Sequence, residues 1–147
     1  VEDFKLTSGT FVHVGTLRVA AIAACSPVVH DALVAGQDRA YVGLLAWPNI
    51  EACRQLVGKP QATADELIRE RAVIDRVREG LRAYDAGQGG SSTRVRRAML
   101  MSEPPSIDGN ELTDKGYINQ RAALERRAAM VEALYAEPPG PDVIVID

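Results

Sequence analysis

Cysteine is scarce in this sequence, which has only two, and neither forms a CxxC pair. A secreted domain of this size that depends on disulfides normally carries more, so a reducing cytoplasm is the expected compartment. Cys25 and Cys53 both stand in apolar, helix-like contexts, which predicts buried and unreactive thiols. His13 and His30 have no further histidine or clustered carboxylate at ligand spacing, so no metal site is predicted.

Long apolar runs are also missing. The apolar stretch from Leu17 to Ala24 contains Arg18 and is far shorter than the ~20 residues that cross a bilayer. An excess of one charge is absent too, because 17 basic and 20 acidic residues give a formal net charge of -3. Neither nucleic acid nor an anionic membrane is therefore an expected partner. A phosphate-binding loop of the GxxxxGK[ST] kind does not occur either.

The residues that are present suit one compact domain. The chain has 147 residues, of which 46% are hydrophobic, and this is enough to bury a core. It starts at Val1 with no methionine and no basic-then-apolar signal sequence. We therefore expect it to begin inside a longer polypeptide.

Apolar periodicity and turn residues predict an α+β domain. Residues 5–14 form a hairpin pattern turned at Ser8 and Gly9, where glycine supplies a positive φ. Helices are expected over residues 17–25, 49–57, 63–86 and 117–136, and core strands over residues 28–35, 41–47 and 95–101. The expected fold is a small three-stranded antiparallel or mixed sheet, covered by helices and preceded by the short β-hairpin. Residues 137–147 have no predicted place in it.

Two segments, one toward each end of the chain, resemble a known family. Residues 1–14 run Val-Glu-Asp-Phe-Lys-Leu-Thr-Ser-Gly-Thr-Phe-Val-His-Val, and residues 110–121 run Asn-Glu-Leu-Thr-Asp-Lys-Gly-Tyr-Ile-Asn-Gln-Arg. The first resembles the acidic hinge and glycine-turned hairpin at which adenylate-forming (AMP-binding) enzymes pass from a large domain to a small mobile one. The second resembles their terminal motif of Thr, a Gly-Lys pair, an apolar residue and Arg. By this resemblance residues 1–136 are the mobile C-terminal domain, residues 137–147 are a tail, and a large N-terminal domain is missing.

Three stretches of sequence look most like feruloyl-CoA synthases: residues 3–6 (Asp-Phe-Lys-Leu), 38–43 (Asp-Arg-Ala-Tyr-Val-Gly) and 113–121. The resemblance implies an ATP-dependent acid:CoA ligase that converts an aromatic acid such as ferulate into an acyl-adenylate and then an acyl-CoA thioester. ATP with Mg and CoA would be substrates of the full-length enzyme. The partners would be its own large domain and the small carboxylic acid. The isolated domain is expected to be inactive and to bind no cofactor alone.

The second segment carries the implied catalytic residue. Aligned on Thr113 and Ile118, the family's lysine position is held by Tyr117, and Lys115 stands two positions earlier. In the implied role, the Lys115 ammonium offsets the repulsion between the attacking carboxylate and the α-phosphate of ATP. The alternative is a solvated loop lysine beside Asp114. Tyr117 would then simply begin the last helix.

The first segment carries two further implied roles. Asp3 would be the hinge about which the small domain turns, and the alternative is a frayed terminal residue. Gly9, at the hairpin turn, would bind CoA by lining the path of the pantetheine arm, and the alternative is an ordinary turn. Arg94, Arg96 and Arg97 are candidates for the CoA phosphates or for a solvated basic strand edge.

Two other functions stay open for the chain. One is a stand-alone α+β protein-interaction domain that uses the helix over residues 63–86 or an edge of the sheet. The other is the small domain of a fatty acid ligase or a carboxylate reductase, which keeps the family but changes the reaction. Residues upstream of Val1 would discriminate among these functions.

Overall fold

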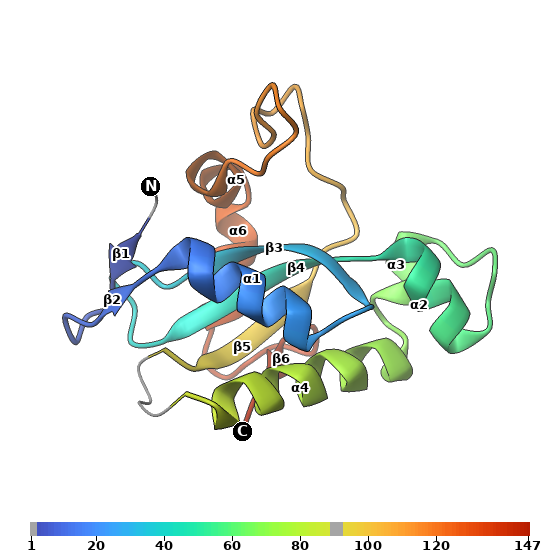
Figure 1. Cartoon of the computed structure of the whole chain (residues 1–147), viewed down its shortest axis with the longest axis horizontal. Helices are drawn as coiled ribbons and strands as arrows, with labels where there is room; N and C mark the ends of the chain where they lie inside the picture. The colour runs from blue at the N-terminus through green and yellow to red at the C-terminus, as the bar shows by residue number, and fades with distance from the viewer. Residues whose placement is uncertain (1–2, 89–92) are drawn as a thin grey trace.

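The computed structural model describes residues 3–88 and 93–147, which form a two-stranded hairpin, a four-stranded sheet and covering helices (Figure 1). The elements in chain order are β1 (Phe4–Lys5), β2 (Phe11–Val12), α1 (Val14–Ala24), β3 (Val29–Ala35), β4 (Val42–Pro48), α2 (Ile50–Val57), α3 (Ala64–Leu67), α4 (Arg71–Ala86), β5 (Val95–Leu100), α5 (Gln120–Arg126), α6 (Ala128–Tyr135) and β6 (Ile144–Val145).

The main sheet has the strand order β3-β4-β5-β6. The β3–β4 and β5–β6 pairs are antiparallel, and β4 and β5 are parallel. The long crossover that a parallel pair needs contains helices α2 to α4. The α+β class and the mixed sheet are thus confirmed. The prediction of three core strands is corrected to four, since Ile144 of the unplaced tail pairs with Ala98 of β5. A two-residue strand is too short to leave a periodic signal in the sequence.

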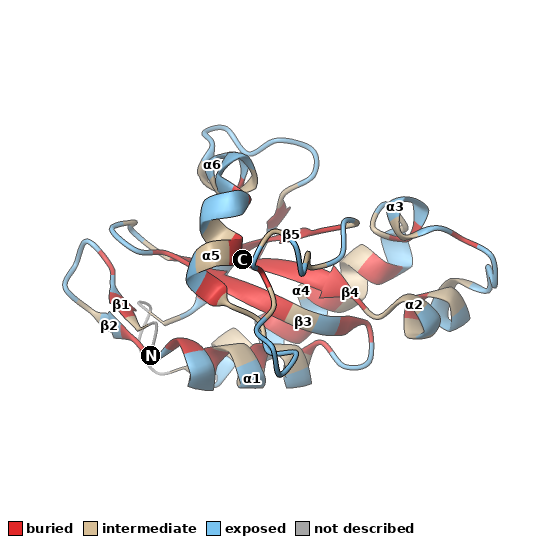
Figure 2. Cartoon of the chain, turned by 90° about the horizontal axis from the view of Figure 1, so that it is seen from above, coloured by how far each residue is buried: buried red, intermediate tan, exposed pale blue. Residues whose placement is uncertain are grey.

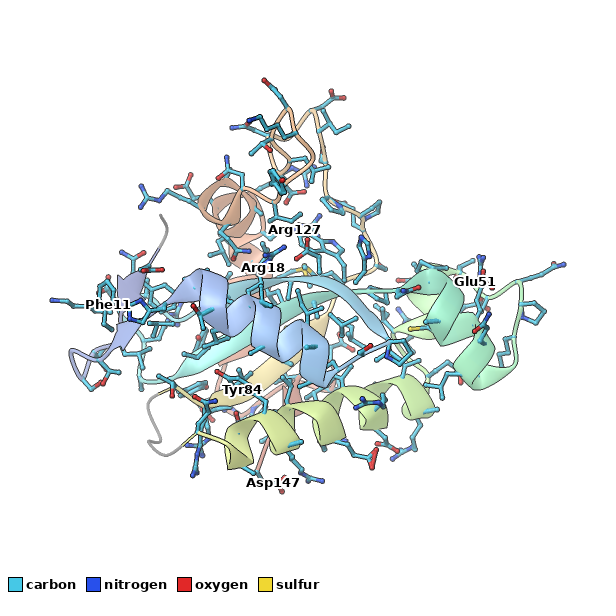
Figure 3. All side chains as sticks on the ribbon, in the orientation of Figure 1. Phe11, Arg18, Glu51, Tyr84, Arg127 and Asp147 are labelled. Atoms are coloured by element: carbon cyan, nitrogen blue, oxygen red, sulfur yellow. The ribbon has the colours of Figure 1, made fainter. Side chains whose placement is uncertain are left out.

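Helices cover both faces of this sheet. Alternate strand residues point to opposite sides, so Leu44 packs in a core with α1 and α4, and Leu45 packs in a second core with α5 and α6. Every residue of β4 is buried, and the strands are predominantly red in Figure 2. In Figure 3, Arg127 lies on the α5 side of the sheet, whereas Tyr84 and Asp147 lie on the α4 side. The second core carries the loop described below.

Two predicted helices are each divided in the structure. The helix expected over residues 63–86 is α3 and α4, although its capping box is confirmed: Thr63 N–H donates to Glu66 Oε1 at 2.8 Å and Glu66 N–H to Thr63 Oγ1 at 3.2 Å. The helix expected over residues 117–136 is α5 and α6, and it begins at Gln120. Arg127 separates them, with φ -103° and ψ 31°. The Arg127 side chain at this break is buried.

Both cysteines are buried, as predicted. Burial raises the pKa of the Cys25 thiol to about 11, although Arg76 opposes it, and burial also raises the pKa of the Cys53 thiol to about 11. Neither thiol is therefore ionised near neutral pH. Within the described ranges, no helix is long and apolar enough to cross a membrane.

Candidate functional site

The loop that contains Lys115 is a miniature hairpin projecting beyond α5 (Figure 1, orange). Leu112 and Ile118 form an antiparallel bridge, and Thr113 N–H donates to the Tyr117 carbonyl at 2.8 Å. Gly116 N–H donates to the Thr113 carbonyl at 2.9 Å, and its φ of +83° makes the tight turn possible. Lys115 therefore stands at the tip of an ordered turn rather than at the start of a helix.

Lys115 and Tyr117 are placed differently by this turn. Lys115 is exposed and, among the described residues, has no hydrogen bond or ion pair. Tyr117 is not helical, which corrects the expected helix start, and it is 68% exposed. It lines a surface hollow of about 350 Å³. The other residues around this hollow are Asp3, Val14, Gly15, Arg18, Ile118 and Gln120.

Asp3 is the residue that brings the start of the chain to this hollow. Its Oδ1 accepts the Val14 N–H at 3.0 Å, and its Oδ2 lies 3.3 Å from His13 Nδ1. Helix α1 has no acidic residue in its first turn and no side-chain cap from His13. The Asp3 carboxylate supplies that missing N-terminal acceptor and complements the helix dipole. The structure thus joins Asp3 and Tyr117 across one hollow.

Gly9 lies outside this hollow, at the tip of the β1–β2 hairpin. Its φ of +88° confirms the predicted turn, and a side chain there would meet no atom within 4 Å. The hairpin is fastened to the β3–β4 connection, because Thr7 N–H donates to the Arg39 carbonyl at 2.9 Å and Asp38 N–H to the Lys5 carbonyl at 3.1 Å. Backbone hydrogen bonds therefore attach the hairpin to the main sheet.

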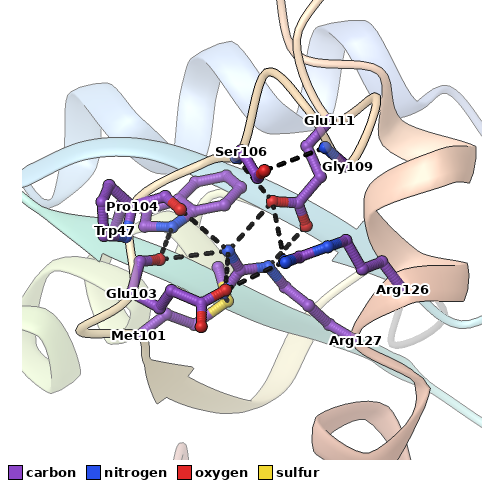
Figure 4. A network of polar contacts seen from close by, with 9 residues as sticks. All are labelled: Trp47, Met101, Glu103, Pro104, Ser106, Gly109, Glu111, Arg126 and Arg127. Atoms are coloured by element: carbon purple, nitrogen blue, oxygen red, sulfur yellow. Dashed lines mark hydrogen bonds and ion pairs between the residues drawn. The ribbon is translucent and has the colours of Figure 1, made fainter.

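A buried ion pair holds the start of the Lys115 loop, and sequence reasoning missed it (Figure 4). Glu111 is fully buried and the Arg127 side chain is 5% exposed. Arg127 Nε donates to Glu111 Oε2 at 2.7 Å and Arg127 Nη2 to Oε1 at 3.1 Å, so the pair is bidentate. Oε1 also accepts the Ser106 N–H at 2.8 Å, and Arg126 Nη1 reaches it at 3.4 Å. The buried carboxylate is fully satisfied.

Arg127 also contacts the segment after β5 and a residue of β4. Its Nη2 donates to the Glu103 and Pro104 carbonyls, both at 3.1 Å. Its guanidinium lies 5.1 Å from the ring centroid of Trp47, whose Nε1 donates to the Glu103 carbonyl at 2.8 Å. One arginine therefore ties the loop to β4 and to the α5–α6 junction.

The charge of Glu111 follows from these contacts. Burial alone would raise the pKa of the Glu111 carboxyl, but the hydrogen bonds from Arg127 and the Ser106 N–H outweigh it. The pKa therefore lies below its ordinary value of 4.5. Glu111 is ionised at neutral pH.

Gln120 holds the other end of the loop. It is 5% exposed, its Oε1 accepts the Val34 N–H at 3.0 Å, and its Nε2 donates to the Ala32 carbonyl at 2.9 Å. Strand β3 is an edge of the sheet, so its outer backbone groups need partners. The Gln120 amide supplies them in the way a neighbouring strand would.

A sequence signal for the buried pair did exist. Ala123, Arg127, Met130 and Leu134 follow helical spacing, and only Arg127 breaks this apolar stripe. A charge on such a stripe requires a buried partner of opposite sign. Arg97 of β5 is also paired: it is 8% exposed, binds the Glu137 carboxylate at 2.5 Å and donates to the Leu134 and Ala136 carbonyls at 3.1 and 2.9 Å. Arg97 is thus engaged inside the domain.

The chain resembles known proteins in sequence profile and in fold. A family profile described as AMP-binding enzyme C-terminal domain matches residues 15–138. The A-PCP didomain of a carboxylic acid reductase from Segniliparus rugosus, in complex with AMP, shares 24% identity at a TM-score of 0.70, over 93% of this chain and 18% of that one. The adenylation domain of a carboxylate reductase from Mycobacterium chelonae shares 24% identity at 0.67, over 92% and 19%.

A third structure is the A domain of the Segniliparus rugosus enzyme with AMP and a co-purified carboxylic acid. It shares 24% identity at a TM-score of 0.64, over 92% of this chain and 20% of that one. At this identity the likeness concerns the fold. No curated protein matches the chain. The chain spans about a fifth of the length of these structures.

The profile match covers most of the chain and the fold agrees with it. The two segments that resemble the family, residues 1–14 and 110–121, both contribute residues to the hollow that Asp3 and Tyr117 line. The chain therefore belongs to the AMP-binding enzyme C-terminal domain family, the small domain of adenylate-forming enzymes.

Proposed function

We propose that this chain is the mobile C-terminal domain of an ATP-dependent aromatic acid:CoA ligase, with ferulate as the type of acid. The observation that supports it most is the shared hollow, which Asp3 lines from the start of the chain and Tyr117 from the terminal loop. In a small domain that rotates against a larger one, the hinge and the loop that reaches the substrate both face the large domain. Asp3 and the loop with Tyr117 have this arrangement, since they line the same hollow.

In this proposal Lys115 assists the first half-reaction. Its ammonium is exposed at the tip of a tight turn and has no partner within the described residues, so it is free to meet a ligand on the large domain. There it offsets the repulsion between the acid carboxylate and the α-phosphate of MgATP. Tyr117, at the family's lysine position, faces the hollow instead and orients the loop against the domain boundary.

Asp3 and Gly9 serve the second half-reaction. After adenylation the domain turns about the backbone of Asp3, and the β1–β2 hairpin with Gly9 then lines the path of the CoA pantetheine arm. The open space around Gly9 suits such an approach. The partners are the chain's own large domain, the carboxylic acid, ATP and CoA, and the compartment is the cytoplasm.

The test of this proposal uses the intact enzyme that contains the chain. Lys115→Ala should lower the rate of acyl-adenylate formation ~10² to 10³-fold, the loss typical of one preorganised charge, and leave thioester formation from preformed adenylate unchanged. Asp114→Ala, at the neighbouring exposed position of the same turn, is the matched control. Equal adenylation by the Lys115→Ala variant and the parent would reject the role of Lys115.

A second variant pair tests the pivot. Asp3→Pro should slow CoA transfer and spare adenylation, because proline fixes φ at the hinge. Asp3→Asn keeps an acceptor for the Val14 N–H and should behave like the parent, which separates backbone stiffening from loss of the cap. An unchanged CoA-transfer rate in Asp3→Pro would remove the pivot from the proposal.

The second candidate is the small domain of a carboxylate reductase. It is favoured by the solved structures of similar fold, which are adenylation domains of that enzyme type. The two candidates differ in the thiol that accepts the acyl group. Assay of the intact enzyme with free CoA separates them: release of acyl-CoA supports the ligase, and aldehyde formed with a hydride donor, without acyl-CoA, supports the reductase.

A further inference from the structure

The Lys115 loop is held at both ends by buried polar side chains. Glu111 comes directly before the Leu112–Ile118 bridge and Gln120 follows soon after it. Glu111 is bound by Arg127, and Gln120 is bound by the backbone of β3. The two anchors draw on different elements, α5–α6 on one side and the sheet edge on the other.

We propose that Glu111, Arg127 and Gln120 are positioning residues that clamp the loop, so that rotation of the whole domain and not movement of the loop decides where Lys115 and Tyr117 act. This inference rests on the proposed function of that loop. It concerns side chains that touch no substrate and reach the reaction only through the loop they hold.

The contacts of Glu111 make its end of the loop rigid. Besides its carboxylate, its backbone is fixed, because its N–H donates to the Ser106 carbonyl at 2.9 Å and its carbonyl accepts the Asn119 N–H at 2.8 Å. The Asn119 contact links the two ends of the loop directly. Moving this end of the loop would separate the buried Glu111 carboxylate from the Arg127 guanidinium. Such a separation is costly in surroundings of low dielectric constant.

The clamp leaves freedom only at the turn itself. Thr113, Asp114, Lys115 and Gly116 are exposed, whereas Glu111 and Gln120 are buried. Lys115 therefore has a flexible side chain on a loop whose two ends are fixed. A shift of these ends by about 1 Å would misplace the Lys115 ammonium and lower the rate ~10²-fold.

The test compares half-reactions in the intact enzyme. Glu111→Gln and Arg127→Lys should each lower kcat of adenylation ~10²-fold, change KM for ATP and acid much less, and spare thioester formation from preformed adenylate. Gln120→Met keeps the length of the side chain but not its hydrogen bonds, and it should likewise lower adenylation and spare thioester formation. It provides the test if the other two variants fold poorly.

Arg97→Lys is the matched control. Arg97 is another buried arginine bound to backbone carbonyls, but its hydrogen bonds go to Leu134, Ala136 and Glu137 at the end of α6 and not to the loop. It should lower thermal stability without changing the ratio of the two half-reactions. If Glu111→Gln, Arg127→Lys and Gln120→Met all leave the ratio of adenylation to thioester formation at the parent value, the clamp is overturned. If the parent enzyme itself forms no acyl-adenylate, the proposed function fails instead.

Discussion

The turns at Gly9 and Gly116 both project from the domain, and they are fixed in different ways. The β1–β2 hairpin, turned at Gly9, is held by backbone hydrogen bonds to the 36–39 turn and by the buried ring of Phe4. The 112–118 loop, turned at Gly116, is held by an ion pair and an amide from distant elements. The hairpin depends on apolar packing and the loop depends on charge, so they should respond to different perturbations.

Loss of the buried arginine should have the largest effect. Arg127→Met leaves Glu111 charged and buried without its bidentate partner, with only the Ser106 N–H and the longer Arg126 contact remaining, so we expect the free energy of unfolding to fall by about 3 to 5 kcal/mol. Urea denaturation followed by the fluorescence of Trp47, the only tryptophan, measures this directly. Glu111→Leu combined with Arg127→Met should cost less than Arg127→Met alone, because no charge is then stranded. A double variant less stable than the single one would contradict this account.

The hairpin should be broken by a different change. Phe4 is 8% exposed and its ring lies against the backbone of Gly36, so Phe4→Ala should lower stability by about 3 kcal/mol, mostly through lost packing. Phe11, on the next strand, is 46% exposed, and Phe11→Ala is the control, with an expected loss under about 1 kcal/mol. Similar losses in both variants would mean that the hairpin is not docked as described.

Acid should weaken the loop before it weakens the hairpin. The folded pKa of Glu111 lies below its ordinary value of 4.5, since Arg127 and the Ser106 N–H outweigh the effect of burial. The ionised Glu111 carboxylate therefore stabilises the fold fully at pH values above 4.5, and this stabilisation is lost as the pH falls through the folded pKa. Denaturation at pH 7 and at lower pH should show a steeper loss in the parent than in Glu111→Gln. Equal slopes would show that Glu111 does not titrate as inferred.

The two turns themselves should respond alike and only modestly. Gly9 and Gly116 have φ of +88° and +83°, so alanine at either position should cost about 1 kcal/mol through backbone strain, although both sites are open. Gly140, where the space is also open and φ is not positive, is the control and should tolerate alanine. A larger cost at Gly116 than at Gly9 would mean that the turn also strains the clamp.

Local patterns predicted much of the fold, and long-range pairing accounts for what they missed. The hairpin turn, the Thr63 capping box and the first three core strands depend on neighbours in sequence or on apolar runs, and all were predicted. The buried Glu111–Arg127 pair at the division of the last helix was missed because its two residues are brought together across the loop and not by neighbours in sequence. The strand β6 was missed because it depends on pairing with Ala98.

The sequence by itself determined the family, since motif order and residue type carry that information, and the roles that the resemblance implies for Asp3, Gly9 and Lys115 stay predictions. Only the tertiary structure placed Asp3 beside Tyr117 at one hollow, left Lys115 at an exposed tip and buried the Glu111–Arg127 pair that holds the loop. The physical reason is burial: a charge removed from water must be paired, and its partner is selected by distance in space rather than along the chain.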